Sequence, residues 1–229
     1  MSGEMLTMTE KLEEITKRMF ASYALTREYR IADTKLRKKR EEENLALLDK
    51  YLRAQPVLID RLVEIGYFDA PASANHHLAV RGGLAMHSVN VTRNLLYLSA
   101  HYGVEWPRVE SPYIVGMFHD LCKCFMYSVH PNGKEISKVQ SAYPGHGTAS
   151  AYIAMVRLGI DLRESELMAI QYHMGAFNLE GKGLAELDAA LDLYPKQIVC
   201  THTADMLAAR VDEAADSLWK PRQGWGNQY

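Results

Sequence analysis

The sequence lacks several features that would assign it to a broad class at once. It has no apolar stretch long enough to span a bilayer, and its charged N-terminus, "MSGEMLTMTEKLEEITKRMF", shows no signal-peptide pattern. It has three cysteines, Cys122, Cys124 and Cys200, which is an odd number and too few for a disulfide framework. We therefore expect a cytoplasmic protein with reduced thiols and no membrane partner.

The sequence also lacks an excess of charge of one sign. Lysine and arginine number 26 and aspartate and glutamate 28, which gives a formal net charge of −2. This balance does not favour a strongly basic nucleic-acid surface, although a nucleic acid stays open as a substrate. The 229 residues are 48% hydrophobic and 24% charged, which suits one globular domain with a proper core.

Apolar residues recur at helical spacing along almost the whole chain, which predicts an all-α protein. We expect a helical segment over 1–44, a main domain over 45–215 and a tail over 216–229. The N-terminal helices would pack on the domain or form a homodimer, and Thr7 with Glu10 resembles a capping box. "SPYIVGMFHDLCKCFMY" has helical length and spacing, and His119 with Asp120 would end this helix, whereas 127–143 contains Pro-Asn-Gly and indicates a hairpin or an irregular loop.

Histidines and aspartates are spread along these helices at intervals of about one helix plus a connection. In chain order they are His87, His119 with Asp120, His146, His173 and Asp205. Successive helices can therefore each bring a ligand to a common centre. Imidazole and carboxylate without thiolate favour zinc, manganese, iron, cobalt or nickel. Taken singly, each histidine is more simply a hydrogen-bonded core or surface residue, and no second cysteine pair completes a zinc site with the C-x-C of Cys122 and Cys124.

As an ordered set, these residues resemble the motifs of the HD-domain superfamily of metal-dependent phosphohydrolases. The resemblance is carried by "GGLAMHSVNV", "FHDLCK", "YPGHG", "AIQYHMG" and "HTADMLAAR", over roughly residues 70 to 212. In the His-Asp motif the family more often has glycine at the position of Cys122. "APASANHHLAVRGGLAMHS" also resembles the HD domain of bacterial exoribonucleases. The segment before it has no β-barrel pattern, so the chain looks closer to stand-alone bacterial or phage-type HD hydrolases.

The resemblance implies an HD-domain helical bundle with extra N-terminal helices and a metal centre. One metal would be held by the set His87, His119, Asp120 and Asp205. A second metal, bridged by Asp120, would be held by His146 and His173. The implied reaction is hydrolysis of a phosphomonoester or phosphodiester, of a nucleotide or another small molecule, by a metal-activated water.

Three further residues are candidates for binding the substrate. Lys123 matches the family lysine that contacts phosphate, and it lies on the same helical face as Asp120 if the helix continues. His77 and Arg81 could also contact phosphate, although surface-loop roles are as simple for both. Two alternative functions stay open: a di-iron oxygenase with the same ligands acting on a small organic substrate, and an inactive nucleotide-binding protein.

Overall fold

The computed structural model describes residues 51–213 apart from 53, 54, 131–135, 144, 178 and 180, together with isolated residues 7, 10, 13, 14, 17, 42 and 46. The predictions for the N-terminal helical segment, its role in dimerisation and the tail over 216–229 therefore lie outside the described residues. The capping box is an exception and is confirmed. The Thr7 backbone N–H donates to Glu10 Oε2 at 2.8 Å, and the Glu10 N–H donates to Thr7 Oγ1 at 3.3 Å.

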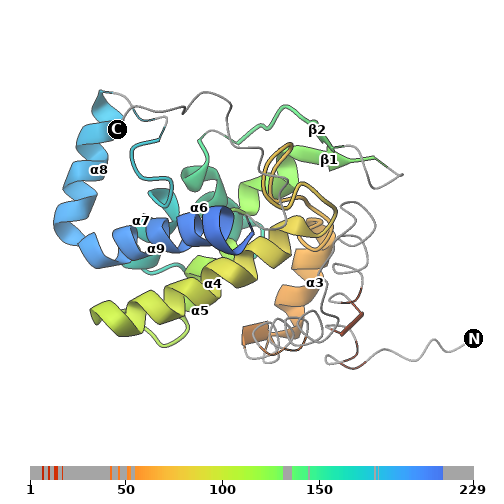
Figure 1. Ribbon diagram of the computed structural model, residues 1–229, viewed down its shortest axis with the longest axis horizontal. Helices are drawn as coiled ribbons and strands as arrows, with labels where there is room; N and C mark the ends of the chain where they lie inside the picture. The colour runs from red at the N-terminus through yellow and green to blue at the C-terminus, as the bar shows by residue number, and fades with distance from the viewer. Residues whose placement is uncertain are drawn as a thin grey trace, which may run out of the picture.

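The described chain is mostly helical, as predicted (Figure 1). The α-helices are α3 (Pro56–Glu64), α4 (Gly83–Tyr102), α5 (Ser111–Phe118), α6 (Gly147–Val156), α7 (Glu164–Gln171), α8 (Lys182–Leu193) and α9 (Pro195–Leu207). A 3₁₀ helix, η1 (Leu121–Phe125), follows α5, and a π-helical turn, η2 (Ala208–Asp212), follows α9. Strands β1 (Tyr127–Val129) and β2 (Ile136–Lys138) form one antiparallel hairpin, which the sequence offered as one of two possibilities.

Helix α4 lies at the centre of the molecule, between α5 and α9 (Figure 1). Gly82 begins it with φ +76°, a conformation that glycine adopts without strain. A Cβ on Gly83 would overlap the Leu78 carbonyl oxygen, so the chain before the helix packs directly against its first turn. The side chains of Leu84, Val89 and Val91 are fully buried, and they fix the helix within the hydrophobic core.

The predicted helix is broken at the His-Asp pair, where the sequence placed its end, and the helical spacing that continues to residue 127 does not extend it. Helix α5 ends at Phe118, His119 caps it, and Asp120 has left the helical region with φ −116° and ψ 20°. The Lys123 N–H then donates to the Asp120 carbonyl oxygen at 3.0 Å, which begins the tighter η1. The break turns the His119 and Asp120 side chains toward the same centre, and it still leaves Lys123 beside Asp120.

Two other helices differ from expectation. Helix α8 was not predicted, although Leu184, Leu187 and Leu191 recur in it at helical spacing, and of its residues Leu187 and Ala190 are buried. Helix α7 ends at Gln171, two residues before His173, which therefore lies in the following turn. Among the described residues, no helix is both long and apolar enough to cross a membrane.

A buried carboxylate fastens the start of α7 to the start of α5. Glu166 is fully buried and accepts hydrogen bonds from Ser111 Oγ at 2.7 Å and from the Arg163 N–H at 2.9 Å. Arg108 completes a bidentate pair with it at 2.8 and 2.7 Å.

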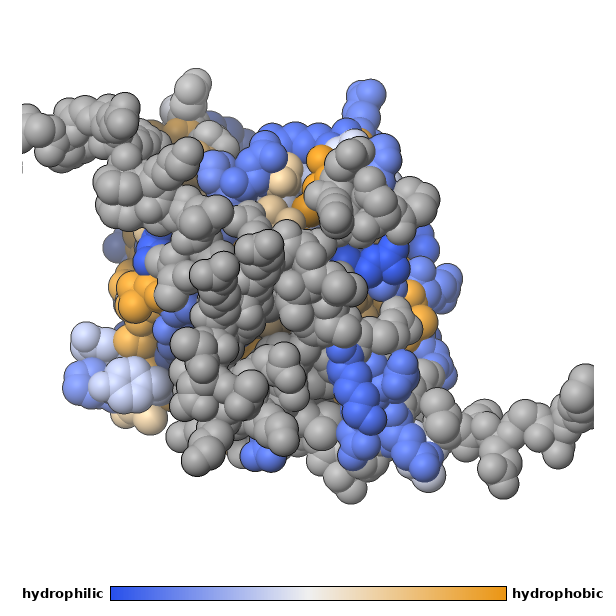
Figure 2. Space-filling view, turned by 45° about the vertical axis from the view of Figure 1, so that its right-hand side comes forward, coloured by the Kyte–Doolittle hydropathy of each residue, from blue (hydrophilic) through white to orange (hydrophobic). Residues whose placement is uncertain are grey.

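On the face of the molecule shown in Figure 2, the hydrophobic residues among those described form small separate groups beside hydrophilic ones. Several residues inside the molecule are nevertheless polar, among them His87, His119, Asp120 and His173.

Candidate metal centre

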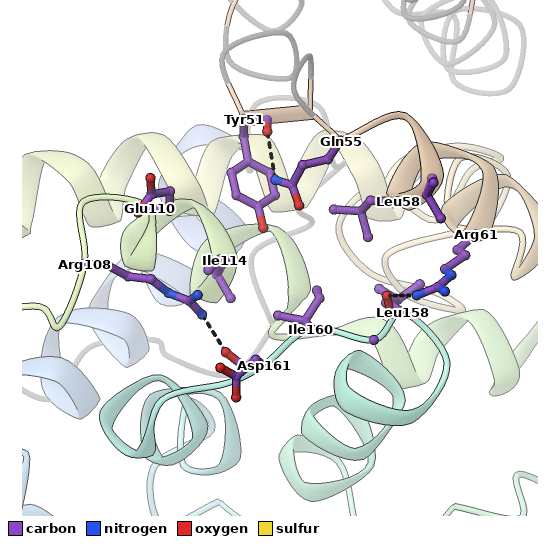
Figure 3. Close-up of a pocket in the computed structure, with 12 residues that line it drawn as sticks. Tyr51, Gln55, Leu58, Arg61, Arg108, Glu110, Ile114, Leu158, Ile160 and Asp161 are labelled. Carbon is purple, nitrogen blue, oxygen red and sulfur yellow. Dashed lines mark hydrogen bonds between the residues drawn. The ribbon is translucent and has the colours of Figure 1, made fainter.

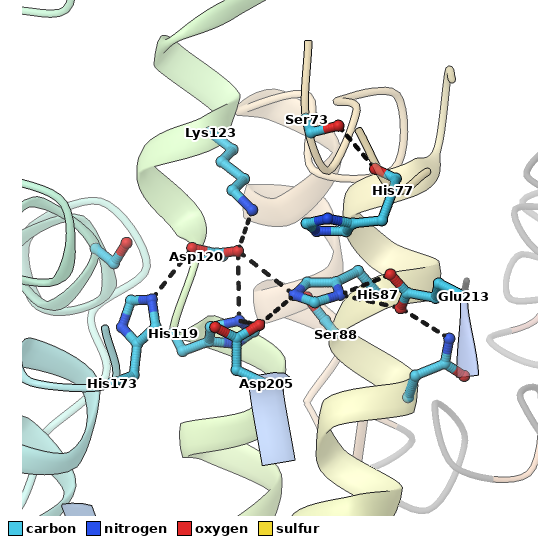
Figure 4. A network of polar contacts seen from close by, with 12 residues as sticks. Ser73, His77, His87, Ser88, His119, Asp120, Lys123, His173, Asp205 and Glu213 are labelled. Carbon is cyan, nitrogen blue, oxygen red and sulfur yellow. Dashed lines mark hydrogen bonds and ion pairs between the residues drawn. The ribbon is translucent and has the colours of Figure 1, made fainter. Parts of the chain in front are cut away.

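The fold brings together all six residues that the sequence nominated as metal ligands. His87 lies on α4, His119 and Asp120 at the α5–η1 break, His146 before α6, His173 after α7 and Asp205 on α9. Figure 4 labels five of the six, and in it the rings of His87, His119 and His173 lie around the carboxylates of Asp120 and Asp205. Three of the histidines, His87, His119 and His173, have no exposed surface. The common centre that was expected from the spacing of these residues is therefore present.

Asp120 lies at the middle of the cluster and divides it. Its Oδ2 lies 3.6 Å from His87 Nε2 and 3.3 Å from His119 Nε2. Its Oδ1 lies 2.6 Å from His146 Nε2 and 3.5 Å from His173 Nε2. Each oxygen of this carboxylate thus faces its own pair of histidines, which is the arrangement that a carboxylate bridging two cations requires.

Two of the rings are held from behind by main-chain carbonyls. His119 Nδ1 lies 2.9 Å from the Gly116 carbonyl oxygen, and His173 Nδ1 lies 2.7 Å from the Ile170 carbonyl oxygen. A carbonyl can only accept, so both Nδ1 atoms carry the proton. In the neutral ring the Nε2 atom is then a lone-pair acceptor. Both rings therefore present an acceptor to the centre of the cluster.

These acceptors face other acceptors. Among the described residues, the buried Nε2 atoms of His87, His119 and His173 have no hydrogen-bond partner, and the nearest polar atoms are carboxylate oxygens. Buried acceptors that face each other without a donor are unfavourable, because each has lost its hydration. A proton on each ring or a cation between the groups removes the conflict. A divalent cation removes it for several groups at once.

His87 differs from the other rings because a carboxylate lies on each side of it. Asp205 Oδ1 lies 3.0 Å from its Nε2, and Glu213 Oε1 lies 3.0 Å from its Nδ1. Burial alone would lower the pKa of His87, but Glu213 and Asp205 together raise it to about 10. In the absence of a metal, His87 is therefore protonated at neutral pH.

His146 is the most accessible of the four rings. Its side chain is 26% exposed, and its Nδ1 lies 3.2 Å from Cys122 Sγ. Burial, followed by the charge of Asp120, raises the pKa of the Cys122 thiol to about 12, so the sulfur is uncharged. The thiol is a weak hydrogen-bond partner for the ring, in contrast to the carboxylate behind His87.

Charges around Asp120 keep it ionised despite its burial. Burial raises its pKa, but Lys123, His119 and His146 lower it well below its usual value. The Lys123 ammonium forms an ion pair with Asp120 Oδ2, and this pairing keeps the pKa of the buried lysine raised. For Asp205, burial is outweighed by His87 and His119, and its pKa is also lowered. Two carboxylates at the centre are thus negatively charged and ready to bind cations.

The donor set fits divalent metals. His87, His119 and Asp205 each offer a ligand atom within 4.8 Å of the others, and so do His119, Asp120 and His173. A third group consists of Asp120, Cys122 and His146. Imidazole nitrogens and carboxylate oxygens at this separation suit zinc, manganese, iron, cobalt or nickel. The cluster can therefore hold a metal, with Asp120 able to contribute to more than one position.

Sequence reasoning missed the residues that lie behind the rings. Glu213 was not identified, and Cys122 was considered as a reduced thiol, as part of a C-x-C pair and as a departure from the family motif, but not as a neighbour of His146. A buried acid far along the chain from its histidine gives no local sequence signal. His202, on α9, lies behind another part of the cluster, since its Nδ1 is 2.7 Å from the His173 carbonyl oxygen.

The three predicted substrate contacts lie in different surroundings. Lys123 touches Asp120, and the ring centre of His77 lies 4.8 Å from that of His87 (Figure 4). Burial, the charge of His87 and that of Lys123 lower the pKa of His77 to about 3, so this ring is neutral. Arg81 is partly exposed and lies 3.6 Å from Asp69. Lys123 and His77 are thus at the cluster, whereas the role of Arg81 in binding phosphate stays a prediction.

A separate cavity of about 410 Å³ lies between α3, the start of α5 and the chain after α6 (Figure 3). None of the residues lining it belongs to the cluster. Its two arginines are already engaged, because Arg61 donates to the Leu158 carbonyl oxygen at 2.6 Å and Arg108 to the Asp161 carbonyl oxygen at 2.8 Å. The cavity is therefore separate from the candidate metal centre.

No protein-family profile, curated protein or solved structure matches the chain. Function must therefore be inferred from the geometry of the cluster and from the sequence motifs that form it.

Proposed function

We propose that this protein is a metal-dependent phosphohydrolase of the HD-domain superfamily, which cleaves a phosphomonoester or phosphodiester bond of a nucleotide. The observation that carries the proposal is the pair of buried Nε2 atoms of His119 and His173, which face the oxygens of Asp120 without a donor between them. A cation-binding centre explains why such a costly arrangement is built into the core.

The proposed ligands form two positions that share Asp120. His87, His119 and Asp205 would hold one metal, and His146 and His173 the other, with one oxygen of Asp120 directed to each. When bound, divalent metals would supply Lewis-acid stabilisation of phosphate oxygens and would lower the pKa of a bound water. The chain itself holds the rings in the correct tautomer through acceptors behind each Nδ1.

Lys123 and His77 support a phosphate ester as the substrate. Lys123 is a buried ammonium paired with Asp120. Cations bound by Asp120 would compete for that pairing and leave the ammonium available to an anionic group. The unpaired Nε2 of His77 lies beside the same centre and can serve as a neutral hydrogen-bond partner. Both residues would orient the substrate, while neutralisation of its charge would come from Lys123.

The test combines metal analysis with a substrate screen. The protein is purified without chelator and without a histidine tag, and its metal content is measured by elemental analysis. It is then assayed with p-nitrophenyl phosphate, bis-p-nitrophenyl phosphate, nucleoside monophosphates and cyclic nucleotides, each with added manganese, cobalt, nickel or zinc. We expect about two metals per chain and hydrolysis of at least one of these esters.

Matched aspartate variants complete the test. Asp120→Asn should lose metal and activity, whereas Asp161→Asn should keep both, because Asp161 is an exposed partner of Arg163 away from the cluster. Failure to bind any added metal, or full activity in Asp120→Asn, would overturn the proposal. Two tightly bound iron atoms with consumption of dioxygen would replace it with the oxygenase alternative.

A further inference from the structure

Glu213 is a buried carboxylate whose main partner is a proposed metal ligand. It is 1% exposed, and its Oε1 and Oε2 lie 3.0 and 3.2 Å from His87 Nδ1. Asn90 Nδ2 donates to Oε1 at 3.0 Å. Two groups of α4 thus contact the Glu213 carboxylate, and one of them is the ring that faces the metal centre.

We propose that Glu213 is a positioning residue that makes the metal position of His87, His119 and Asp205 the tighter of the two. The inference rests on the metal centre of the proposed function and goes beyond it, because it assigns unequal affinities to the two positions. An ionised carboxylate can only accept, so it keeps the proton of a neutral His87 on Nδ1. The Nε2 lone pair is then directed at the centre, and the ring becomes a stronger donor to a metal.

The ring of His87 is held between two carboxylates from the same C-terminal stretch of chain. Asp205, on α9, lies at its Nε2, and Glu213, just after η2, lies at its Nδ1 (Figure 4). The π-helical turn between them is an irregularity that is frequently found at functional sites. One segment thus supplies a metal ligand to one side of the ring and its supporting partner to the other.

One face of α4 fastens this segment in place. Asn90 contacts Glu213, and one turn further along the helix Asn94 Nδ2 donates to Asp212 Oδ2 at 2.8 Å. Asn94 Nδ2 also lies 3.4 Å from the Ala204 carbonyl oxygen. The position of Glu213 is therefore set by contacts on α4 that do not involve His87, so the carboxylate is held in place before a metal binds.

The other rings have weaker support. His119 and His173 are backed by neutral carbonyls and His146 by an uncharged thiol. Only His87, among the four histidines, is backed by a carboxylate in the described chain. This difference predicts that loss of Glu213 affects one metal position much more than the other.

The decisive experiment measures both metal-binding steps directly. The full chain is stripped of metal and titrated with Zn²⁺ in competition with a chromophoric chelator, which gives dissociation constants for the first and second equivalents. We expect Glu213→Gln to weaken the first equivalent roughly 10-fold and Glu213→Ala up to roughly 100-fold. Gln should be the milder change, because it keeps the size of the side chain and one acceptor oxygen.

Asp212→Asn is the matched control. Asp212 is the neighbouring acid and does not touch His87, and asparagine at this position keeps an oxygen that can accept the hydrogen bond from Asn94 Nδ2. The contact that fastens the segment to α4 is therefore retained. This variant removes the same charge one residue away, and it should leave both dissociation constants within a factor of about two. The second equivalent should change little in any of the three variants.

The outcomes separate this inference from the proposed function. If the unaltered protein binds no Zn²⁺, the metal centre itself is wrong and both proposals fall. If it binds two equivalents and Glu213→Gln does the same with unchanged constants, only the role of Glu213 is refuted. If both dissociation constants rise equally and the metal-free variant unfolds at a lower temperature, Glu213 has a merely structural role. This result would also refute the proposed role of Glu213. Glu213→Gln alone decides the matter if Glu213→Ala does not fold.

Discussion

The two sides of the cluster differ in how firmly the protein holds them. The His87 side consists of His87, His119 and Asp205, and the His146 side consists of His146 and His173, with Asp120 between them. On the His87 side both rings are fully buried, and Glu213 lies behind one of them. On the His146 side one ring is 26% exposed and has an uncharged thiol behind it.

Histidines of the same cluster can therefore differ in how tightly they hold a metal. A buried ring backed by a carboxylate is suited to holding a metal permanently, because its orientation and donor strength are fixed. A ring that is partly exposed and weakly supported is suited to a position that exchanges metal or meets substrate. We therefore expect a tight metal on the His87 side and a weaker one on the His146 side.

The largest expected effect comes from removing one ring from each side. His87→Ala should lose the tight metal and reduce ester hydrolysis to background, whereas His146→Ala should retain one tightly bound metal. Elemental analysis after dialysis measures the difference. His101→Ala is the control, since His101 lies on α4 but is exposed and stacks on Tyr97. Equal metal loss from His87→Ala and His146→Ala would contradict the comparison.

Gly116 lies at a close helix contact on the His87 side, and Gly147 lies at one on the His146 side. A Cβ on Gly116 would overlap Thr92 of α4, and one on Gly147 would overlap the Gln171 carbonyl oxygen at the end of α7. Each substitution by alanine should lower the free energy of unfolding by about 1–3 kcal/mol, because a rigid neighbour must move. Denaturant unfolding measures this loss.

Metal binding then tells the two glycine variants apart. Gly147→Ala should weaken the second metal and spare the first, and Gly116→Ala should weaken the first. Gly183→Ala is the control, because its Cβ would meet only the flexible side chain of Leu179. It should be neutral or stabilise α8 by up to about 1 kcal/mol. A Gly147→Ala protein that binds both metals normally would argue against separate sides.

The pH dependence should reveal the charged partner of His87. Its pKa is raised from 6.5 to about 10 by Glu213 and Asp205, against the effect of burial. A raised pKa stabilises the metal-free fold fully below about pH 6.5, and this contribution is lost as the pH rises through about 10. A metal must displace that proton, so the first dissociation constant should fall as the pH rises through the same window.

Two measurements check this dependence. Calorimetric titration in buffers of different ionisation enthalpy should detect release of about one proton with the first metal near pH 8. Denaturant unfolding of the metal-free protein should show stability declining from pH 7 to pH 10. Both effects should shrink in Glu213→Gln. A first metal that binds without proton release would show that His87 is neutral in the metal-free protein.

The smallest expected effect concerns the thiol behind His146. Cys122→Ala should weaken the second metal only roughly threefold, less than the loss expected for a carboxylate partner, because sulfur is a weak hydrogen-bond partner. Cys200→Ala, which removes another buried thiol in α9, should not change metal binding. The cobalt-loaded protein should show no sulfur-to-cobalt charge-transfer band. An intense near-ultraviolet band, absent in Cys122→Ala, would instead make Cys122 a direct ligand.

Much of the cluster could be predicted because its ligands lie in local motifs. "FHDLCK" and "YPGHG" could be identified from the sequence as ligand-bearing segments, and the order of five such motifs predicted that they converge. The end of the helix at the His-Asp pair was also expected, whereas the 3₁₀ helix after it was not, since the apolar pattern continues through it. Helix α8 was missed, although Leu184, Leu187 and Leu191 recur in it at helical spacing.

By itself, the sequence determined a mostly helical chain, the order of its histidines and aspartates, and the type of cation they can bind. These properties depend on residue type and on spacing along one helix or turn. Only the tertiary structure decided that Glu213 lies behind His87 and Cys122 behind His146. Such pairings depend on how α4, α6 and α9 pack, and no short-range pattern encodes a contact between residues as far apart as 87 and 213.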